Sequence, residues 1–211
     1  GQADLIYYNG TFYLCIVVEI PDTTPLKFDK FLGVDLGIVN IATTSDGTQW
    51  SGEQIDKTRK RVSNHRARLQ KRGSKSAKRR LKKISRKQSR FVQNINHIIS
   101  KKIVQAAKAL NLGRAVEKLH KIKKTVRKPR RPRDNQWPFC QLRQFLKYKS
   151  QIAGLPYTEV NPAYTSQICS QCGHSSSKNR KTQSDFTCIN CGLSINADLN
   201  AAINIAARAS I

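Results

Sequence analysis

The sequence lacks any apolar run long enough to cross a membrane as a helix, and it is poor in acidic residues. Asp and Glu total 13 against 39 Lys and Arg, so the formal net charge is +26. No signal peptide opens the chain, and its cysteines are not spread as a disulfide framework. These features argue against a membrane or secreted protein, and we expect a cytoplasmic, nucleoid-associated one. The positive excess favours nucleic acid as the partner.

The basic residues are concentrated where acids are missing altogether. No acid falls between Asp56 and Glu117, and 21 of the 39 basic residues lie there. A solvated helical face normally mixes both signs of charge, and like charges on helical neighbours are destabilising unless something such as bound phosphate relieves them. We therefore predict nucleic-acid contacts here and at three later positions: Arg59, Arg61, Arg66, Arg68, Lys71, Arg72, Lys78, Arg79, Arg80, Lys82, Lys83, Arg86, Lys87, Arg90, Arg127, Lys178 and Arg180.

The same basic region is expected to be helical. Apolar residues from Val92 to Leu110 recur at spacings of three and four, which predicts an amphipathic helix. The upstream part has a thinner apolar stripe, and Gly73-Ser74 is predicted to divide it into two helices.

An apolar, β-prone run spans residues 31–42 and carries one carboxylate, Asp35. The run predicts a buried strand and its return, with a tight turn at Asp46-Gly47. An acid inside such a run is costly unless it is compensated, and a bound cation is the usual compensation. Two other interpretations stay open for Asp35: a carboxylate that caps a turn, and the phosphate-gripping Asp-x-Gly turn of an actin-like or sugar-kinase-like ATPase.

Shorter elements flank these regions. Residues 4–20 predict a β-hairpin around Asn9-Gly10, which either extends the central sheet or belongs to a domain that begins elsewhere, with Cys15 as an inert core residue. A linker spans residues 21–25.

A weak strand ends at Glu117, where a surface ion pair is the alternative to a functional role. The basic, proline-punctuated residues 121–138 precede a helix that contains Cys140 and ends before Gly154, and then a strand at residues 157–160.

Four of the six cysteines form two Cys-x-x-Cys pairs separated by 15 residues. This spacing is typical of a structural zinc site with four thiolates, and the pairs are Cys169 with Cys172 and Cys188 with Cys191. Such a shell is closed, so the zinc would hold structure without doing chemistry. Paired disulfides are the alternative that the zinc interpretation displaces.

The last stretch, residues 195–206, predicts a helix capped by Asn196. Asp198 falls in its first turn, where the helix dipole favours an anion. Asn200 and Asn204 are four residues apart and therefore share a face.

Three motifs occur here in a recognisable order. Gly33-Val34-Asp35-Leu36-Gly37 comes first, the run Thr-Ser-Gln-x-Cys-Ser-x-Cys-Gly begins at Thr165, and Asp-x-Asn-Ala-Ala-x-Asn-Ile begins at Asp198. Together with Glu117 and the second cysteine pair, they resemble the C-terminal half of the TnpB (OrfB) transposon-encoded nucleases, relatives of the type V CRISPR effectors. The resemblance covers about residues 1–207.

The resemblance implies an α/β fold: an RNase H-like (RuvC) mixed sheet with flanking helices, an inserted zinc ribbon and an N-terminal β-hairpin. It divides the chain into closing strands of a wedge-like domain (1–28), a nuclease core (29–164) with a basic helical insertion (53–110), the zinc ribbon (165–194) and a final helix (195–211).

The resemblance also implies a function: Mg²⁺-dependent cleavage of target DNA directed by a guide RNA. Asp35, Glu117 and Asp198 would hold two catalytic Mg²⁺ ions, with Asp35 as the bridging ligand. All three acids are present, unlike in the family's nuclease-dead repressors. The family's N-terminal recognition helices are missing, so a second chain or copy would supply that half. Arg114 and Lys118 depart from the usual apolar and acidic surroundings of the Glu strand. The alternative function is a nucleic-acid-binding module that no longer cuts by itself.

Overall fold

The computed structural model describes residues 1–8, 10–19, 28–118 and 139–210. The predicted linker at residues 21–25, the basic segment at residues 121–138 with Arg127, and Asn9 of the predicted turn lie outside the described residues. In the part that is described, no helix is both long and apolar enough to cross a membrane.

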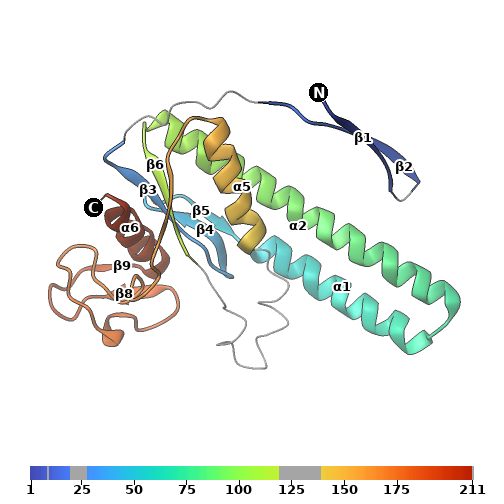
Figure 1. Cartoon of the computed structure of the whole chain (residues 1–211). Helices are drawn as coiled ribbons and strands as arrows, with labels where there is room; N and C mark the ends of the chain where they lie inside the picture. The colour runs from blue at the N-terminus through green and yellow to red at the C-terminus, as the bar shows by residue number, and fades with distance from the viewer. Residues whose placement is uncertain (9, 20–27, 119–138, 211) are drawn as a thin grey trace.

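A five-stranded mixed sheet lies at the centre of the fold (Figure 1). Its strands follow the spatial order β5-β4-β3-β6-β7. In this sheet β4 pairs antiparallel with both β3 and β5, whereas β6 runs parallel to both β3 and β7. The strands are β3 (Phe31–Asp35), β4 (Asn40–Thr44), β5 (Gln49–Ser51), β6 (Gly113–Glu117) and β7 (Tyr157–Val160). The strand and return predicted within residues 31–42 and the strand predicted at residues 157–160 are thus present, in the α/β class that the resemblance implied.

Helices cover both faces of this sheet. On one face, α2 (Lys75–Ala109) and α5 (Phe139–Ile152) close the main core, in which Leu32, Val34 and Val116 are almost fully buried. On the other face lies α6 (Ala197–Ala209). It approaches β3 so closely that a Cβ on Gly33 would lie 2.0 Å from the backbone oxygen of Ala202. A glycine is therefore required at that position.

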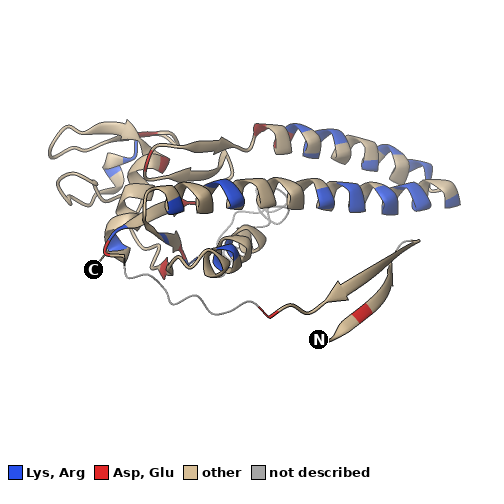
Figure 2. Cartoon of the chain, turned by 90° about the horizontal axis from the view of Figure 1, so that it is seen from above, with Lys and Arg blue, Asp and Glu red and all other residues tan. Residues whose placement is uncertain are grey.

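The basic insertion is a helical hairpin formed by α1 (Glu53–Arg72) and α2. Gly73, with φ of +65°, ends α1, and the Ser74 hydroxyl caps α2, so the predicted break is confirmed. Figure 2 shows Lys and Arg along the whole length of both helices, whereas acids are confined to the start of α1. Leu110, which the periodicity assigned to the apolar face, is 52% exposed because α2 has ended before it.

The N-terminal hairpin consists of β1 (Ala3–Tyr8) and β2 (Thr11–Ile16) and forms a two-stranded sheet of its own. Of the two expected outcomes, an extension of the central sheet is therefore wrong, because the hairpin does not pair with that sheet. Cys15 was predicted to be a core residue and is exposed, because these two strands carry no further layer in the described part of the chain. Cys140 in α5 is also exposed.

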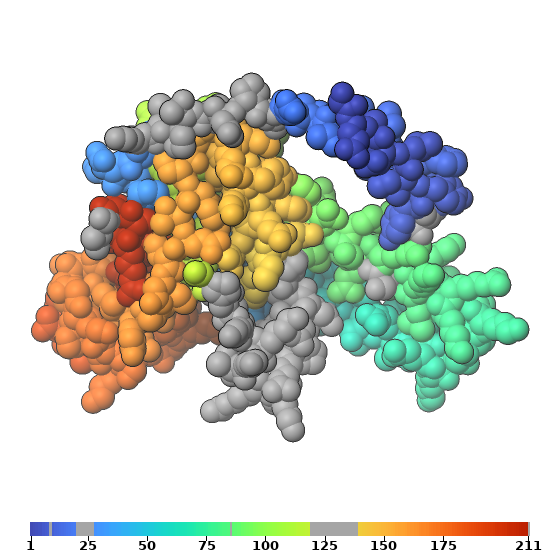
Figure 3. Space-filling view, viewed as in Figure 1, coloured from blue at the N-terminus to red at the C-terminus, as the bar shows by residue number. Residues whose placement is uncertain are grey.

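A small module rich in cysteine connects β7 to α6. It contains one short 3₁₀ turn, η1 (Ser177–Asn179), and the antiparallel pair of β8 (Asp185–Thr187) and β9 (Ser194–Asn196). Phe186 is fully buried among Cys169, Cys188 and Ala197 in its own small core. In the space-filling view this module (orange) and the helical hairpin (green) lie at opposite ends of the molecule (Figure 3).

Candidate metal centres and nucleic-acid interface

Asp35 and Glu117 end two neighbouring parallel strands, β3 and β6. Val34 pairs with Val116, so the two acids lie one position further on, at the same edge of the sheet. Side chains alternate along a strand, so both acids point to the face covered by α6, as Gly33 and Ala115 do.

Glu117 is buried, with 8% of its surface exposed, so the interpretation as a surface ion pair is wrong. The hydroxyl of Thr165 donates a hydrogen bond to the Oε1 atom of Glu117, and the Pro162 carbonyl oxygen lies 3.0 Å from the same hydroxyl. Thr165 is the first residue of the Thr-Ser-Gln-x-Cys run. Its hydrogen bond to Glu117 explains why a threonine stands at that position.

Asp198 lies in the first turn of α6, where Asn196 caps the helix by accepting from the Asp198 and Leu199 backbone N–H groups. The Asn40 side chain donates to Oδ2 of Asp198 at 3.0 Å. The Arg180 guanidinium, from the cysteine-rich module, lies 3.7 Å from Oδ1. Arg180 was predicted as a nucleic-acid contact, and the structure places it beside this acid.

The electrostatics link the three carboxylates. Burial, followed by repulsion from Glu117 and then from Asp198, raises the pKa of Asp35 to about 8, although Arg180 and the Leu36 backbone act in the opposite direction. Burial also raises the pKa of Glu117, against the hydrogen bond from Thr165 and the charge of Arg208. Asp35 is therefore under-compensated by protein cations, as expected for a carboxylate that a bound cation would satisfy.

Thr43 adds an unmet donor at the same place. It pairs directly with Asp35 across β3 and β4, so the two side chains share a face. Its hydroxyl is buried and has no hydrogen-bond partner within the described residues. A buried donor without a partner is costly and calls for an explanation such as an ion or a water molecule bound there.

Sequence reasoning did not assign roles to Thr43, Asn40 or Thr165. Asn40 carried a weak signal, since it is a polar residue inside the apolar run of residues 31–42. The others became visible only through contacts between distant parts of the chain.

Two asparagines attach α6 to the cysteine-rich module. The Asn200 side chain accepts from the Ser170 N–H group and donates to the Ile168 carbonyl. Asn204 donates to the carbonyls of Thr165 and Ile168. The two residues share a face, as predicted, and they fix the segment that carries both Thr165 and the first cysteine pair.

The four predicted cysteine ligands converge. Their sulfur atoms all lie within 4.8 Å of one another, and Cys169–Cys191 and Cys172–Cys188 are each separated by 3.6 Å. A tetrahedral ion with Zn–S bonds of about 2.3 Å requires sulfur separations of about 3.8 Å. The two sulfurs of a disulfide would be about 2.05 Å apart, so the disulfide interpretation does not fit these separations. Among the described residues, these four cysteines are the one group of three or more possible ligands whose ligand atoms all lie this close together. Asp35, Glu117 and Asp198 do not form a second group of this kind.

The two cysteine pairs have matching backbone geometry. Gly173 donates to the Cys169 carbonyl at 3.0 Å, and Gly192 donates to the Cys188 carbonyl at the same distance. Both glycines have positive φ, 74° and 75°, which allows the tight turn after the second sulfur. Each turn thus presents two sulfurs toward one point, and the donor set suits zinc.

The predicted nucleic-acid contacts on the helical hairpin are mostly exposed. Arg59, Arg66 and Arg86 are half-buried, and the others on α1 and α2 are exposed. Arg86 lies over the ring of Tyr8 at 5.8 Å. Lys178 is exposed in the cysteine-rich module.

Comparison with known proteins identifies the family. The family model described as "Probable transposase" (OrfB_IS605) matches residues 15–127, more than half of the chain. The chain belongs to the TnpB (OrfB) family. A second model, "Cas12f1-like, TNB domain", matches residues 139–205, which include the cysteine-rich module.

Individual relatives agree with this TnpB assignment. The chain is 32% identical over 216 residues to the CRISPR-associated endodeoxyribonuclease Cas12f1 of Sulfoacidibacillus thermotolerans, covering 94% of this chain and 50% of that protein. It is 29% identical over 220 residues to the TnpB-like protein MJ0751 of Methanocaldococcus jannaschii, covering 93% of this chain and 78% of that protein. The chain thus spans half the length of that Cas12f1.

A solved structure shares the fold. The chain superimposes on Cas12f1 in a Cas12f1–sgRNA–target DNA complex with a TM-score of 0.68 and 20% identity, over 97% of this chain and 55% of that one. This likeness supports the α/β arrangement of sheet and helices described above.

Proposed function

We propose that this chain is the RuvC-like nuclease part of an RNA-guided DNA endonuclease. The observation that carries the proposal is that Asp35 is buried near enough to Glu117 and Asp198 for burial and repulsion from both acids to raise its pKa to about 8. The strand order β5-β4-β3-β6-β7, with an antiparallel half and a parallel half, is consistent with an RNase H-like sheet.

Asp35, Glu117 and Asp198 would hold Mg²⁺, because hard carboxylate oxygens suit that ion. Two such ions, when bound, stabilise both the attacking and the leaving oxygen of an in-line displacement at phosphorus. The Thr43 hydroxyl, which has no partner among the described residues, and the raised pKa of Asp35 both fit a cation at this edge.

The chain's other residues would support that chemistry. Thr165 orients Glu117, and Asn40 orients Asp198. Arg180 lies close enough to these acids to neutralise a phosphate presented to them. The cysteine-rich module would be a zinc ribbon that fixes Arg180 and α6, and the exposed cations of α1 and α2 would line the channel for guide RNA and target DNA.

The domain division proposed here follows the sequence: residues 1–28, 29–164 with the insertion at 53–110, 165–194 and 195–211. In RNA-guided systems base pairing carries the sequence information, and the protein reads mainly backbone and shape. A second chain or copy would complete the nucleic-acid channel.

The test is guided cleavage by the purified chain, loaded with its co-purifying RNA and given matched DNA and Mg²⁺. Asp35→Ala, Glu117→Ala and Asp198→Ala should each abolish cleavage while RNA binding persists. Glu159→Ala is the control, since that acid pairs with Arg143 away from the site. Cleavage that survives Asp35→Ala would overturn the proposal.

The second candidate is a nucleic-acid-binding module that does not cut by itself. The observation that favours it is that Asp198 and Glu117 already have protein partners, Arg180 and Thr165. It predicts tight RNA binding without Mg²⁺-dependent cleavage under any loading. An ATPase role for Asp35 is not proposed, because the basic, cysteine-rich surroundings do not suit it.

A further inference from the structure

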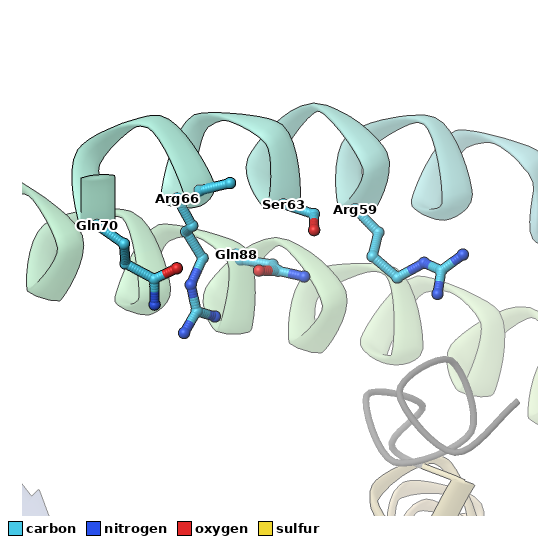
Figure 4. Close-up of a pocket in the computed structure, with 6 residues that line it drawn as sticks. Arg59, Ser63, Arg66, Gln70 and Gln88 are labelled. Carbon is cyan, nitrogen blue, oxygen red and sulfur yellow. The ribbon is translucent and has the colours of Figure 1, made fainter. Parts of the chain in front are cut away.

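A polar groove of about 270 Å³ runs between α1 and α2. Figure 4 shows side chains of α1 extending toward α2, with Gln88 of α2 between Arg66 and Arg59. The lining contains no acid and consists of Arg59, Ser63, Arg66, Ala67, Gln70 and Gln88.

The α1 residues of this groove form one helical face. Arg59, Ser63, Arg66 and Gln70 are spaced by four, three and four residues, the spacing that places apolar side chains in an ordinary helix pair. Here these four side chains are polar, while Ile55 and Leu69 on the same helix are buried. These four side chains add no hydrophobic stabilisation to the helix pair, and their donors and acceptors can serve a polar ligand.

Arg59, which lines the groove, has a donor without a partner among the described residues. Its Nη2 atom lies 3.5 Å from Asp56, whereas its Nε atom is buried without a hydrogen-bond partner in the described part of the chain. A guanidinium offers paired donors in one plane, the geometry that recognises a phosphate. Arg66, seven residues further along α1, adds a second guanidinium on the same face.

A bound phosphate would not by itself account for the two glutamines and the serine that line the groove. Amide and hydroxyl groups both donate and accept, so they suit a sugar hydroxyl or a base edge. The 2′-hydroxyl, which is both donor and acceptor, is the group that distinguishes RNA from DNA. We propose that this groove binds a short stretch of an RNA strand, with its phosphates on Arg59 and Arg66 and its ribose hydroxyls against Gln70 and Gln88.

This inference rests on the proposed function in so far as RNA is the expected partner, but it assigns a separate role to the groove. The rest of the hairpin supplies cations that contact phosphates of either nucleic acid. The groove would add discrimination between the ribose of RNA and the deoxyribose of DNA.

The test measures binding of the full chain to a single-stranded RNA and to a DNA of the same sequence, without divalent cations. Gln88→Ala and Gln70→Ala should each weaken RNA binding about fivefold, the equivalent of one neutral hydrogen bond, and leave DNA binding unchanged. Arg66→Ala should weaken both and reduce the slope of log K against log salt concentration by about 0.7. Gln93→Ala, an exposed glutamine of α2 outside the groove, is the matched control and should change neither.

Equal weakening of RNA and DNA binding by the two glutamine variants, or no weakening by either, would overturn the inference. Circular dichroism of each variant checks that the hairpin is intact. Cleavage is measured separately with Mg²⁺, so a failure of the nuclease proposal would not be mistaken for a failure of the groove.

Discussion

Asn40 and Asp198 lie 158 residues apart in the sequence, yet the Asn40 amide donates to the Asp198 carboxylate at 3.0 Å. Asn40 begins β4 and Asp198 lies in the first turn of α6, so this bond joins sheet and helix at the candidate metal edge. This donor fixes the orientation of the Asp198 carboxylate, whose other oxygen lies 3.7 Å from the Arg180 guanidinium.

Removing that donor should weaken metal binding. Asn40→Ala is expected to lower the affinity for Mg²⁺ or Mn²⁺ by 10- to 100-fold, the range typical when a group that orients a metal ligand is lost. Calorimetric titration measures the effect. Gln49→Ala is the control, because its amide donates to the Asn196 side chain instead of to a carboxylate. Equal affinity in the Asn40 variant and the wild type would remove Asn40 from the site.

The raised pKa of Asp35 predicts a pH dependence of metal binding. With a pKa of about 8, the carboxyl of the metal-free protein is mostly protonated at neutral pH, so a divalent cation must displace a proton. Mg²⁺ affinity should therefore rise with pH up to about 8 and level off above it. Titrations over this range, with proton release followed in two buffers, measure both quantities. Affinity independent of pH would contradict the assignment.

The same shift has a consequence for stability. The folded metal-free protein keeps the Asp35 proton to a higher pH than the unfolded chain, whose ordinary pKa is 3.8, so stability should fall as pH rises from 3.8 toward 8. Asp35→Asn should flatten this dependence, as seen in urea unfolding at several pH values. An unchanged pH profile in the variant would assign the dependence to other groups.

The cysteine cluster predicts one zinc ion per chain. Cys172→Ser should lose that zinc and lower the melting temperature, because a structural zinc site contributes directly to folding. Cys140→Ser is the matched control, an exposed cysteine outside the cluster. Elemental analysis of both variants decides the matter, and full zinc content in Cys172→Ser would show that the ion is held elsewhere.

Two adjacent threonines offer a paired test of the buried hydroxyl. Thr43 has no partner for its hydroxyl among the described residues, whereas the Thr44 hydroxyl donates to Asp46 and lies 3.1 Å from the Thr48 carbonyl oxygen. In the metal-free protein Thr43→Val should leave the free energy of unfolding equal or raise it by about 1 kcal/mol, and Thr44→Val should lower it by about 1 kcal/mol. Urea denaturation compares them. Equal losses would mean that the Thr43 hydroxyl has a partner in solution.

Local patterns in the sequence predicted most of the elements. Gly73-Ser74 ended one helix and began the next because a left-handed glycine and a serine cap need no distant partner. The pairing of cysteines across 15 residues was likewise legible from spacing. In contrast, Cys15 was misjudged because burial depends on what lies against a hairpin, and that is not a local property.

The supporting residues of the candidate site could not be found in this way. Thr165 meets Glu117 and Arg180 meets Asp198 only because α6 and the cysteine-rich module pack against the sheet. Asn204 makes that packing specific through two carbonyls. Such contacts join positions that no periodicity relates, so they required the three-dimensional structure.

The most direct test of the central claim is a crystal structure of the chain with Mn²⁺, located by its anomalous scattering. The account predicts Mn²⁺ ligated by Asp35, Glu117 and Asp198 at the edge where β3 and β6 end. Mn²⁺ bound elsewhere, with Glu117 still engaged by Thr165 and Asp198 by Arg180, would contradict it.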